Sequence, residues 1–323
     1  MSKSVPTILI TGAGGYIGSE TIKALATGPA SEKPQHIVGL DVRDCPPYLE
    51  GYKDFTYLKS DVRDSGMAEI MKKYDVQIVV HLASIVTPPK NSNREFEYSV
   101  DVLGTKNVLD CCLKAGVKKV IITSSGAAYG YYADNPAWLK ETDALRGNYE
   151  FPYSDHKRIV EEMLAEYRTK YPELKQIIFR PGTVIGKNTK NQITDLFQRP
   201  IIIGITGSNS PFVFIWDQDV VGCIVHGITT DRTGIYNLAG DGALPIQEIA
   251  KIMKKRYVPI PEKILAAALT VLKKVGLTEL GPERIRFLQY RPVLANDNLK
   301  SGFGYIPKKT SKEAFLYYLE NRQ

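Results

Sequence analysis

A glycine-rich segment, TGAGGYIG at residues 11–18, constrains the fold of this chain more than any other feature. An apolar run precedes it, a helical pattern follows at once, and Gly12, Gly15 and Gly18 are spaced three apart. One glycine allows the unusual backbone angles of the turn, another lets a pyrophosphate approach the backbone, and the third lets helix and strand pack closely. Free N–H groups at the helix N-terminus can then bind phosphates. The segment therefore predicts a dinucleotide-binding turn.

The rest of the first half repeats this order of apolar run and helical pattern. The runs lack strict alternation, which is typical of strands covered on both faces. Strands and helices in regular succession predict an α/β fold with a doubly wound, parallel Rossmann sheet. We expect strands at 7–11, 36–40, 56–59, 77–83, 119–124 and 176–180. We expect helices at about 16–28, 64–74, 92–116 and 154–171.

The pattern changes after Arg180, where the loops lengthen. One more strand–helix–strand passage follows at about 212–241, and from about residue 245 the chain shows mostly short helical patterns. We therefore expect two domains. Residues 1–180, with the returning segment at about 212–241, should form the Rossmann domain, and residues 181–323 should form a smaller, mostly helical substrate-binding region.

Acidic residues follow the second and third expected strands. Asp41 lies 23 residues after Gly18, close to the ~20 typical of a carboxylate that binds ribose hydroxyls. Such a carboxylate would repel a 2′-phosphate, so NAD is favoured over NADP, although Arg43 could bind that phosphate. Asp61 and Val62 could hold the adenine edge, or Asp61 could simply cap a helix.

The segment FPYSDHK at 151–157 places Tyr153 and Lys157 four residues apart, on one face of an expected helix. A lysine ammonium beside a tyrosine hydroxyl stabilises the phenolate and would lower the pKa of the tyrosine. The tyrosine could then exchange a proton with an alcohol or carbonyl while hydride moves to or from a nicotinamide. Upstream, TSSGAAYG at 123–130 ends an expected strand, where its adjacent serines could contact a substrate.

Together these motifs resemble the extended short-chain dehydrogenase/reductase family, also called the NAD-dependent epimerase/dehydratase family. The resemblance covers roughly the first 190 residues, with the motifs in the order and at the spacing of the family. It is specific for the family and weak on the substrate. The motifs are TGAGGYIG, Asp41, DVRD at 61–64, HLAS at 81–84, VDVLGTKNVL at 100–109, SSGAAYG and YSDHK.

The resemblance implies that Ser125 hydrogen-bonds the reacting oxygen, that Tyr153 is the acid/base, and that Lys157 also holds the nicotinamide ribose. It also implies a homodimer formed through the helices at 92–116 and 154–171, although their apolar residues could equally belong to the core. The expected cofactor contacts are Gly12, Gly15, Tyr16, Ile17, Gly18, Asp41, Arg43, Asp61, Val62, Leu82, Ala83, Ser84, Tyr153, Lys157 and Pro181. The expected substrate contacts are Ser84, Ser125, Ala127 and Thr183.

Two departures from the family pattern lie close to the expected catalytic residues. The family often carries Asn where this chain has Asp101, whose oxygen can still accept a hydrogen bond but adds a charge near Lys157. Sugar 4,6-dehydratases carry Asp-Glu at the positions of Gly126 and Ala127, and use them to eliminate water. We therefore expect no such elimination, and we expect Ala127 to make room for the substrate.

Further departures concern the substrate. Sugar-nucleotide epimerases usually carry Arg-Asp where this chain has Phe212 and Val213, and Asn where it has Thr183. That arginine would bind the nucleotide phosphates, and its loss removes charge-assisted hydrogen bonds. The pattern RPGTVIG at 180–186 is similar instead to the 3β-hydroxysteroid dehydrogenase and carbonyl-reductase branches. A remote arginine could restore phosphate binding, and the candidates are Arg284, Arg286 and Arg291.

The composition limits the kinds of ligand and partner that the chain is expected to bind. The net charge of +7 comes from scattered basic residues, so we expect a small-molecule substrate and no nucleic acid. The apolar helix expected at 264–272 is shorter than the ~20 residues that span a bilayer, and we expect it to pack against its neighbours rather than to line an apolar pocket. With the first strand near Thr7 there is no room for a signal peptide, and a cytoplasmic location is expected. The dispersed cysteines and histidines predict no metal site.

The leading hypothesis is an NAD-dependent dehydrogenase or reductase that transfers hydride at a secondary alcohol or ketone carbon, with Tyr153 as the acid/base. A nucleotide-sugar 4-epimerase with tightly bound NAD is the alternative. A non-catalytic NAD-binding protein is a third hypothesis, motivated by Asp101 and by the inert side chains at 126–128.

Overall fold

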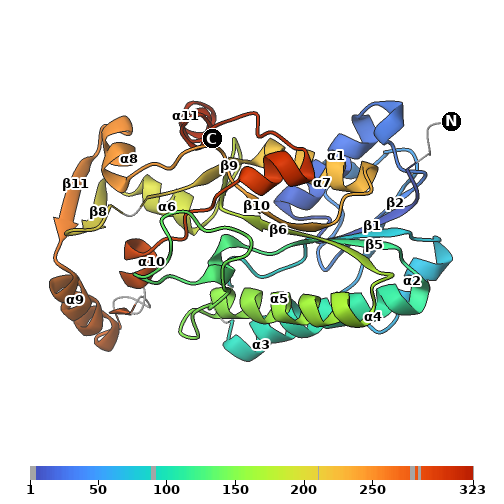
Figure 1. Ribbon diagram of the computed structural model, residues 1–323, viewed down its shortest axis with the longest axis horizontal. Helices are drawn as coiled ribbons and strands as arrows, with labels where there is room; N and C mark the ends of the chain where they lie inside the picture. Colours follow the sequence, from blue (N-terminus) through green and yellow to red (C-terminus); the bar gives the residue numbers. More distant parts are fainter. Residues whose placement is uncertain (1–4, 89–91, 210, 277–280, 283–284, 323) are drawn as a thin grey trace.

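The computed structural model describes residues 5–88, 92–209, 211–276, 281–282 and 285–322. Its centre is a seven-stranded sheet in the order β10-β6-β5-β4-β1-β2-β3, with every pair of neighbours parallel (Figure 1). The strands are β1 (Ile8–Thr11), β2 (Ile37–Asp41), β3 (Phe55–Lys59), β4 (Ile78–His81), β5 (Lys119–Thr123), β6 (Lys175–Pro181) and β10 (Gly234–Leu238). The predicted parallel Rossmann sheet is confirmed, and six of these strands lie within two residues of their expected bounds.

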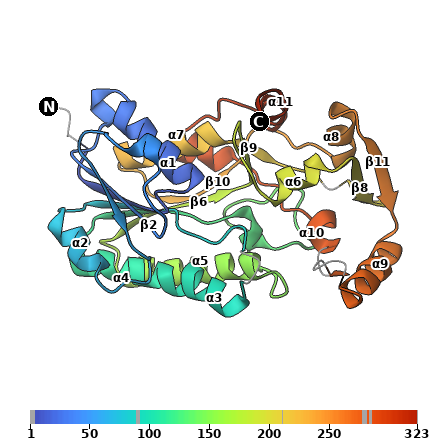
Figure 2. The same ribbon diagram turned by 180° about the vertical axis from the view of Figure 1, so that it is seen from behind.

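Helices cover both faces of the sheet (Figures 1 and 2). One face carries α1 (Tyr16–Thr27) and α7 (Asp217–Thr229), and the other carries α2, α3, α4 and α5. Alternate residues of β1 serve the two cores: Ile8 and Ile10 pack in one, and Leu9 packs in the other. Double coverage is the reason that the strands read as continuous apolar runs. The helices of the second face are α2 (Met67–Lys73), α3 (Arg94–Tyr98), α4 (Thr105–Ala115) and α5 (Pro152–Lys170).

The helix expected at 92–116 is continuous from α3 to α4, but its middle is a π-helical stretch, η3 (Ser99–Gly104). Such a widened turn inside an α-helix often occurs at functional sites. Asp101 lies within it. Short 3₁₀ helices complete this half of the chain: η1 (Ala30–Glu32), η2 (Pro47–Leu49) and η4 (Gly126–Tyr129).

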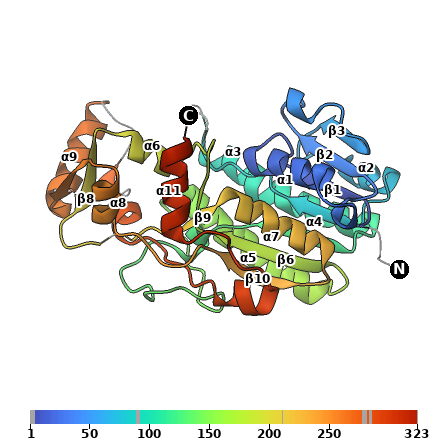
Figure 3. The ribbon, with the colours of Figure 1, turned by 90° about the horizontal axis from the view of Figure 1, so that it is seen from above.

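The C-terminal elements gather at one end of the sheet (Figure 3). They surround a separate apolar core that includes Phe197, Phe212, Phe214 and Phe315. Two parallel strand pairs belong to this end: β7 (Thr183–Ile185) with β9 (Phe214–Trp216), and β8 (Ile201–Ile205) with β11 (Arg256–Ile260). The helical elements are α6 (Gln192–Gln198), α8 (Ile246–Ile252), α9 (Glu262–Lys274), α10 (Ile285–Gln289) and α11 (Ser311–Asn321). The short helix η6 (Leu299–Phe303) instead packs beside β10, with Leu299 and Phe303 in the core of the main sheet.

The sequence did not predict β11. This strand falls where mostly short helices were expected, because Pro259 weakens the strand signal of a segment that pairs along one side with β8. Helix α9 matches the apolar helix expected at 264–272, but none of its residues is fully buried, and it packs against its neighbours along one side only.

Candidate active site

The predicted cofactor residues lie at one edge of the sheet. The glycine turn follows β1, and Asp41 ends β2. Leu82 and Ala83 follow β4, and Pro181 ends β6. Because all these strands are parallel, their carboxyl ends meet along one edge, and the order of the sheet reverses between β1 and β4. Ligands of open parallel sheets bind in the crevice at this switch point.

The geometry of the glycine turn fits a dinucleotide. Gly12 has a φ of 70°, which favours glycine, and a Cβ there would lie 2.8 Å from the amide nitrogen of Ala83. A Cβ on Gly18 would lie 2.2 Å from the Gly12 carbonyl oxygen, so α1 can pack this closely only with glycine. Gly15 caps α1 without a side-chain hydrogen bond, which leaves N–H groups of the first turn available to phosphate oxygens.

Asp41 is already paired within the chain. Its carboxylate accepts hydrogen bonds from the Gly14 amide at 3.0 Å and the Arg43 amide at 3.0 Å. The Arg43 side chain donates two more, from Nε at 2.9 Å and from Nη2 at 2.8 Å. Burial alone would raise the pKa of Asp41, but the bonds from Arg43 and Gly14 hold it below its usual value. The predicted ribose-binding carboxylate and the predicted phosphate-binding guanidinium therefore form one unit.

The same Asp-Val-Arg triplet recurs after β3, and it folds in the same way. Arg63 donates to Asp61 from its amide and Nε, both at 2.9 Å, and from Nη2 at 2.7 Å. Its Nη1 also donates to Ser99 Oγ at 2.9 Å. Sequence reasoning missed Arg63, although the repeated triplet was a signal that could have revealed it.

Tyr16, an expected cofactor contact, donates a hydrogen bond to the carboxylate of Asp217 at the start of α7. Asp217 is buried, and burial raises its pKa. A Cβ on Gly186 would lie 2.0 Å from Oδ2 of Asp217, so this arrangement requires glycine there. Asp217 was not among the predicted site residues, because the family pattern alone gave it no role.

The three predicted catalytic residues come together at the start of α5. Ser125 caps η4, where its Oγ accepts from the Ala127 amide at 3.1 Å, and its side chain is near enough to Tyr153 to favour a lower pKa of that hydroxyl. Lys157 Nζ lies 5.7 Å from the centre of the Tyr153 ring and donates to the Thr123 carbonyl at 3.1 Å. A hydroxyl pair with a nearby ammonium is the arrangement that the sequence predicted.

The pKa of Tyr153 differs from the sequence expectation. Burial and the negative charge of Asp101 raise it above the usual tyrosine value, and the nearby Ser125 side chain only partly offsets them. Burial lowers the pKa of Lys157, while the charges of Asp101 and Glu161 oppose that shift. Lys157 is not among the groups that lower the pKa of Tyr153, and its Nζ donates to the Thr123 carbonyl.

Asp101 anchors the chain behind these residues. Its Oδ1 accepts from Ser84 Oγ at 2.9 Å and from the Ile85 amide at 2.8 Å, as the expected hydrogen-bond acceptor should. Its Oδ2 lies 3.7 Å from Nδ1 of His156, which is fully buried. Within the described part of the chain, neither ring nitrogen of His156 has a hydrogen-bond partner. Ser84 is thus held by Asp101, and a histidine adjacent to Lys157 faces the same carboxylate.

This contact predicts a pH effect for Asp101→Asn. The charge of Asp101 raises the pKa values of both Tyr153 and Lys157, so its removal should lower both. Alcohol oxidation requires the Tyr153 phenolate, so the acid limb of kcat/KM should move to lower pH. The asparagine oxygen still accepts from Ser84 and Ile85, which preserves the fold. Asp110→Asn is the matched control, on α4 beside exposed Lys106. It should leave the acid limb of the pH dependence of kcat/KM unchanged.

On the substrate side, Thr183 Oγ1 accepts a hydrogen bond from Arg291 Nη2 at 3.3 Å. The Arg291 guanidinium lies 4.1 Å from the centre of the Phe212 ring and 4.8 Å from that of Phe287. Phe212 occupies the position where sugar-nucleotide epimerases usually carry arginine. Arg291 therefore places a guanidinium beside Phe212, at the position where the epimerase pattern has an arginine and this sequence does not.

The other two candidate arginines differ. Arg286 pairs with Glu150 at 3.1 Å on the surface, and Arg284 lies outside the described residues. Arg291 makes no ion pair with any acid among the residues that the structure describes. Burial lowers its pKa to about 10. Phe287 also packs against Tyr131 and Phe151, and Phe151 packs against Tyr153, so aromatic rings connect Arg291 to Tyr153.

The small residues after Ser125 have a packing role. A Cβ on Gly126 would lie 3.0 Å from Cδ1 of Leu294, so a larger residue would displace that side chain. Ala127 is buried, and its carbonyl accepts from Ser154 Oγ at 2.7 Å. Gly126 and Ala127 thus stand where the 4,6-dehydratases carry their acid pair. The small size of Gly126 lets Leu294 of the C-terminal segment pack against η4.

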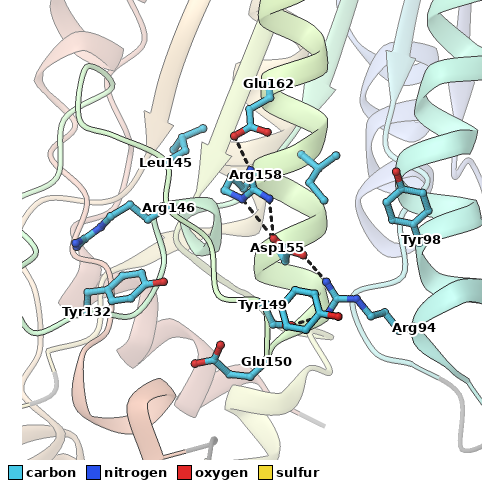
Figure 4. A pocket seen from close by; sticks show the side chains of 11 residues that line it. Arg94, Tyr98, Tyr132, Leu145, Arg146, Tyr149, Glu150, Asp155, Arg158 and Glu162 are labelled. Atoms are coloured by element: carbon cyan, nitrogen blue, oxygen red, sulfur yellow. Dashed lines mark hydrogen bonds and ion pairs between the residues drawn. The ribbon is translucent and has the colours of Figure 1, made fainter.

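A surface cavity of about 820 Å³ lies beside the start of α5 (Figure 4). Arg158 and Asp155 line it from α5, and Arg94 and Tyr149 close one side. Its arginines are already paired: Arg94 and Arg158 both bind Asp155, the latter at 2.9 Å. None of the predicted catalytic residues lines this cavity, so it is separate from the candidate active site.

The sequence model of the NAD dependent epimerase/dehydratase family matches residues 8–239, and the chain belongs to this family. Uncharacterized protein Rv0501 of Mycobacterium tuberculosis is 22% identical over 98% of this chain and 84% of its own length. A UDP-glucose 4-epimerase of Erwinia amylovora is 30% identical over 58% of this chain and 56% of its own. Among solved structures, UDP-glucose 4-epimerase of Thermotoga maritima with UDP-glucose has a TM-score of 0.73 and 18% identity, covering 98% of both chains.

Proposed function

We propose that this chain is an NAD-dependent oxidoreductase that transfers hydride at a secondary alcohol or ketone carbon. The observation that carries the proposal is the grouping of Ser125, Tyr153 and Lys157 at the start of α5, together with a glycine turn shaped for a dinucleotide. NAD, when bound, supplies the hydride acceptor or donor. The chain's own residues supply binding, orientation and the proton.

Each catalytic residue has a distinct role in this proposal. Ser125 holds the substrate oxygen, and Tyr153 takes its proton during oxidation or returns it during reduction. Lys157, whose Nζ lies 5.7 Å from the centre of the Tyr153 ring, binds the nicotinamide ribose and supplies a positive charge near the phenolate as it forms. Gly126 and Ala127 offer no acid or base, so the proposed reaction stops at hydride transfer and eliminates no water.

The proposed cofactor residues are those of the sequence analysis, with Arg43 and Arg63 as partners of the acids. Ser84 and Ala127 remain proposed substrate neighbours, together with Ser125 and Thr183. The homodimer also stays a proposal; α4 and α5 lie on one face of the sheet, where Phe96 and Leu103 are exposed (Figure 2). No helix among the described residues is long and apolar enough to cross a membrane.

A panel of secondary alcohols and ketones with NAD⁺ and NADH tests the proposed reaction. We expect NAD(H)-dependent turnover of at least one class and much weaker turnover with NADP(H), because Asp41 would repel a 2′-phosphate. No redox turnover in the whole panel, together with conversion of a UDP-sugar, would replace this proposal with the next one.

A nucleotide-sugar 4-epimerase with retained NAD is the second candidate, and Arg291 favours it. A partly buried guanidinium with no acid partner in the described chain, held beside Thr183, is suited to a phosphate of the substrate. The aligned Erwinia relative and the Thermotoga structure are both epimerases by name, which supports the same candidate. Both candidate functions use the same Tyr153.

Arg291→Met separates the two candidates. If the substrate is a nucleotide sugar, UDP affinity should fall by more than about tenfold, the effect of losing one charge-assisted bond pair. Arg286→Met removes an equal charge from the surface and should leave UDP affinity unchanged. Calorimetric titration of UDP into the wild type and both variants measures this. Absence of UDP binding to the wild type, with no NAD retained on purification, would eliminate the epimerase.

A further inference from the structure

Helix α9 presents an apolar surface that nothing in the described chain covers. Ile264 and Val271 are each 61% exposed, and Val275, directly after the helix, is 60% exposed. The helix stands at the end of the molecule furthest from β3 (Figures 1 and 3). Its neighbour in the fold is the short helix α10.

The exposed apolar residues form one stripe on the outer side of α9. Ile264, Ala268, Val271 and Val275 follow the spacing of neighbours along a helix surface. The partly buried residues Leu265, Ala266 and Leu269 lie on the other side, which therefore faces the body of the protein. The outer stripe consequently points into solvent.

Two lysines of α9, Lys263 and Lys274, lie beside this stripe. The adjacent line of helix positions, one residue earlier at 263, 267, 270 and 274, reads Lys, Ala, Thr, Lys. Residues 251–276 carry seven basic residues and one acid, so this short segment supplies nearly all of the chain's net charge of +7. The basic residues look scattered in the sequence as a whole, because acids balance them elsewhere.

We propose that α9 binds the surface of an anionic phospholipid membrane, with its outer stripe among the headgroups and its lysines against their phosphates. A helix of 13 residues is about 20 Å long, too short for a hydrocarbon core of about 30 Å, so it lies in the interface instead of crossing it. A second copy of this chain would bring the same positive charge to the stripe and would be repelled. An anionic membrane surface can bury the apolar stripe of α9 among its headgroups and attract the lysines of α9 to its phosphates.

Co-sedimentation with vesicles tests this binding. We expect the wild type to sediment with vesicles of equal parts phosphatidylcholine and phosphatidylglycerol, and to stay largely in the supernatant with phosphatidylcholine alone. Ile264→Glu with Val271→Glu should abolish sedimentation, and Lys263→Gln with Lys274→Gln should weaken it by more than about tenfold. All four side chains lie on the surface, so the fold should persist; circular dichroism checks this.

Ile306→Glu is the matched control, because Ile306 is 74% exposed outside α9 and should leave vesicle binding unchanged. Wild-type protein that remains in the supernatant with the anionic vesicles at low salt would overturn the proposal. So would a stripe variant that sediments like the wild type. If light scattering shows that the stripe variant loses an oligomeric state without vesicles, a second copy covers α9 and the proposal is again overturned.

Discussion

Replacing Tyr153 with phenylalanine should lower kcat by about 10²–10⁴-fold, the usual contribution of a positioned acid/base. The ring and its contact with Phe151 remain, and only the hydroxyl beside Ser125 is lost. The affinity for NAD should change little, because the glycine turn, Asp41 and Lys157 are intact. Steady-state rates with the best substrate of the panel, combined with calorimetric titration of NAD, measure the two effects separately.

Tyr149→Phe is the control for this variant, because Tyr149 is 75% exposed and lies four residues before the catalytic tyrosine. It should retain wild-type kcat. Full activity in Tyr153→Phe would remove Tyr153 from the mechanism, whichever of the two candidate reactions the chain catalyses. Binding of NAD without turnover in the wild type, for both redox and epimerase substrates, would instead favour the non-catalytic hypothesis.

The largest expected effect on stability comes from Glu161→Gln. Glu161 accepts bonds from Arg180 Nε at 2.9 Å and Nη2 at 2.6 Å and from Ser124 Oγ at 2.5 Å. The side chains of Arg180 and Glu161 are only 4% and 2% exposed. Loss of the carboxylate charge leaves a buried guanidinium uncompensated, and the free energy of unfolding should fall by about 3–5 kcal/mol. The midpoint of urea unfolding, followed by circular dichroism, reports this change.

The next residue on α5 provides the comparison. Glu162 pairs with Arg158 at 2.5 Å, but its side chain is 55% exposed. Glu162→Gln should lower the free energy of unfolding by no more than about 1 kcal/mol, because solvent screens an exposed pair. Equal midpoints for the two variants would show that burial of the Glu161 pair does not matter.

The sequence predicted the sheet well, because each strand is covered on both faces and therefore shows as an apolar run. It also predicted the positions of Gly12, Asp41, Ser125, Tyr153 and Lys157 along the edge where parallel strands end. These positions follow from local motifs whose spacing is fixed by the βα units. Their assigned roles stay predictions until the variants are measured.

Contacts between residues far apart in the chain could not be predicted from the sequence. The approach of Arg291 to Phe212 joins residues 79 positions apart, and no motif records it. The same holds for Tyr16 with Asp217 and for His156 with Asp101. The outward orientation of α9 was also hidden, because an apolar helix looks the same in sequence whether it is covered or exposed.

The paired state of Asp41 has a consequence for how a nucleotide is bound. An ionised carboxylate offers about four acceptor positions, and Gly14 and Arg43 fill four in Asp41. A ribose hydroxyl can therefore bind only by displacing the guanidinium, which acts as a tethered competitor. If Asp41 binds the ribose as proposed, this contact exchanges one set of hydrogen bonds for a nearly matched one. It should therefore add little to the affinity for the nucleotide while still selecting a free 2′-hydroxyl.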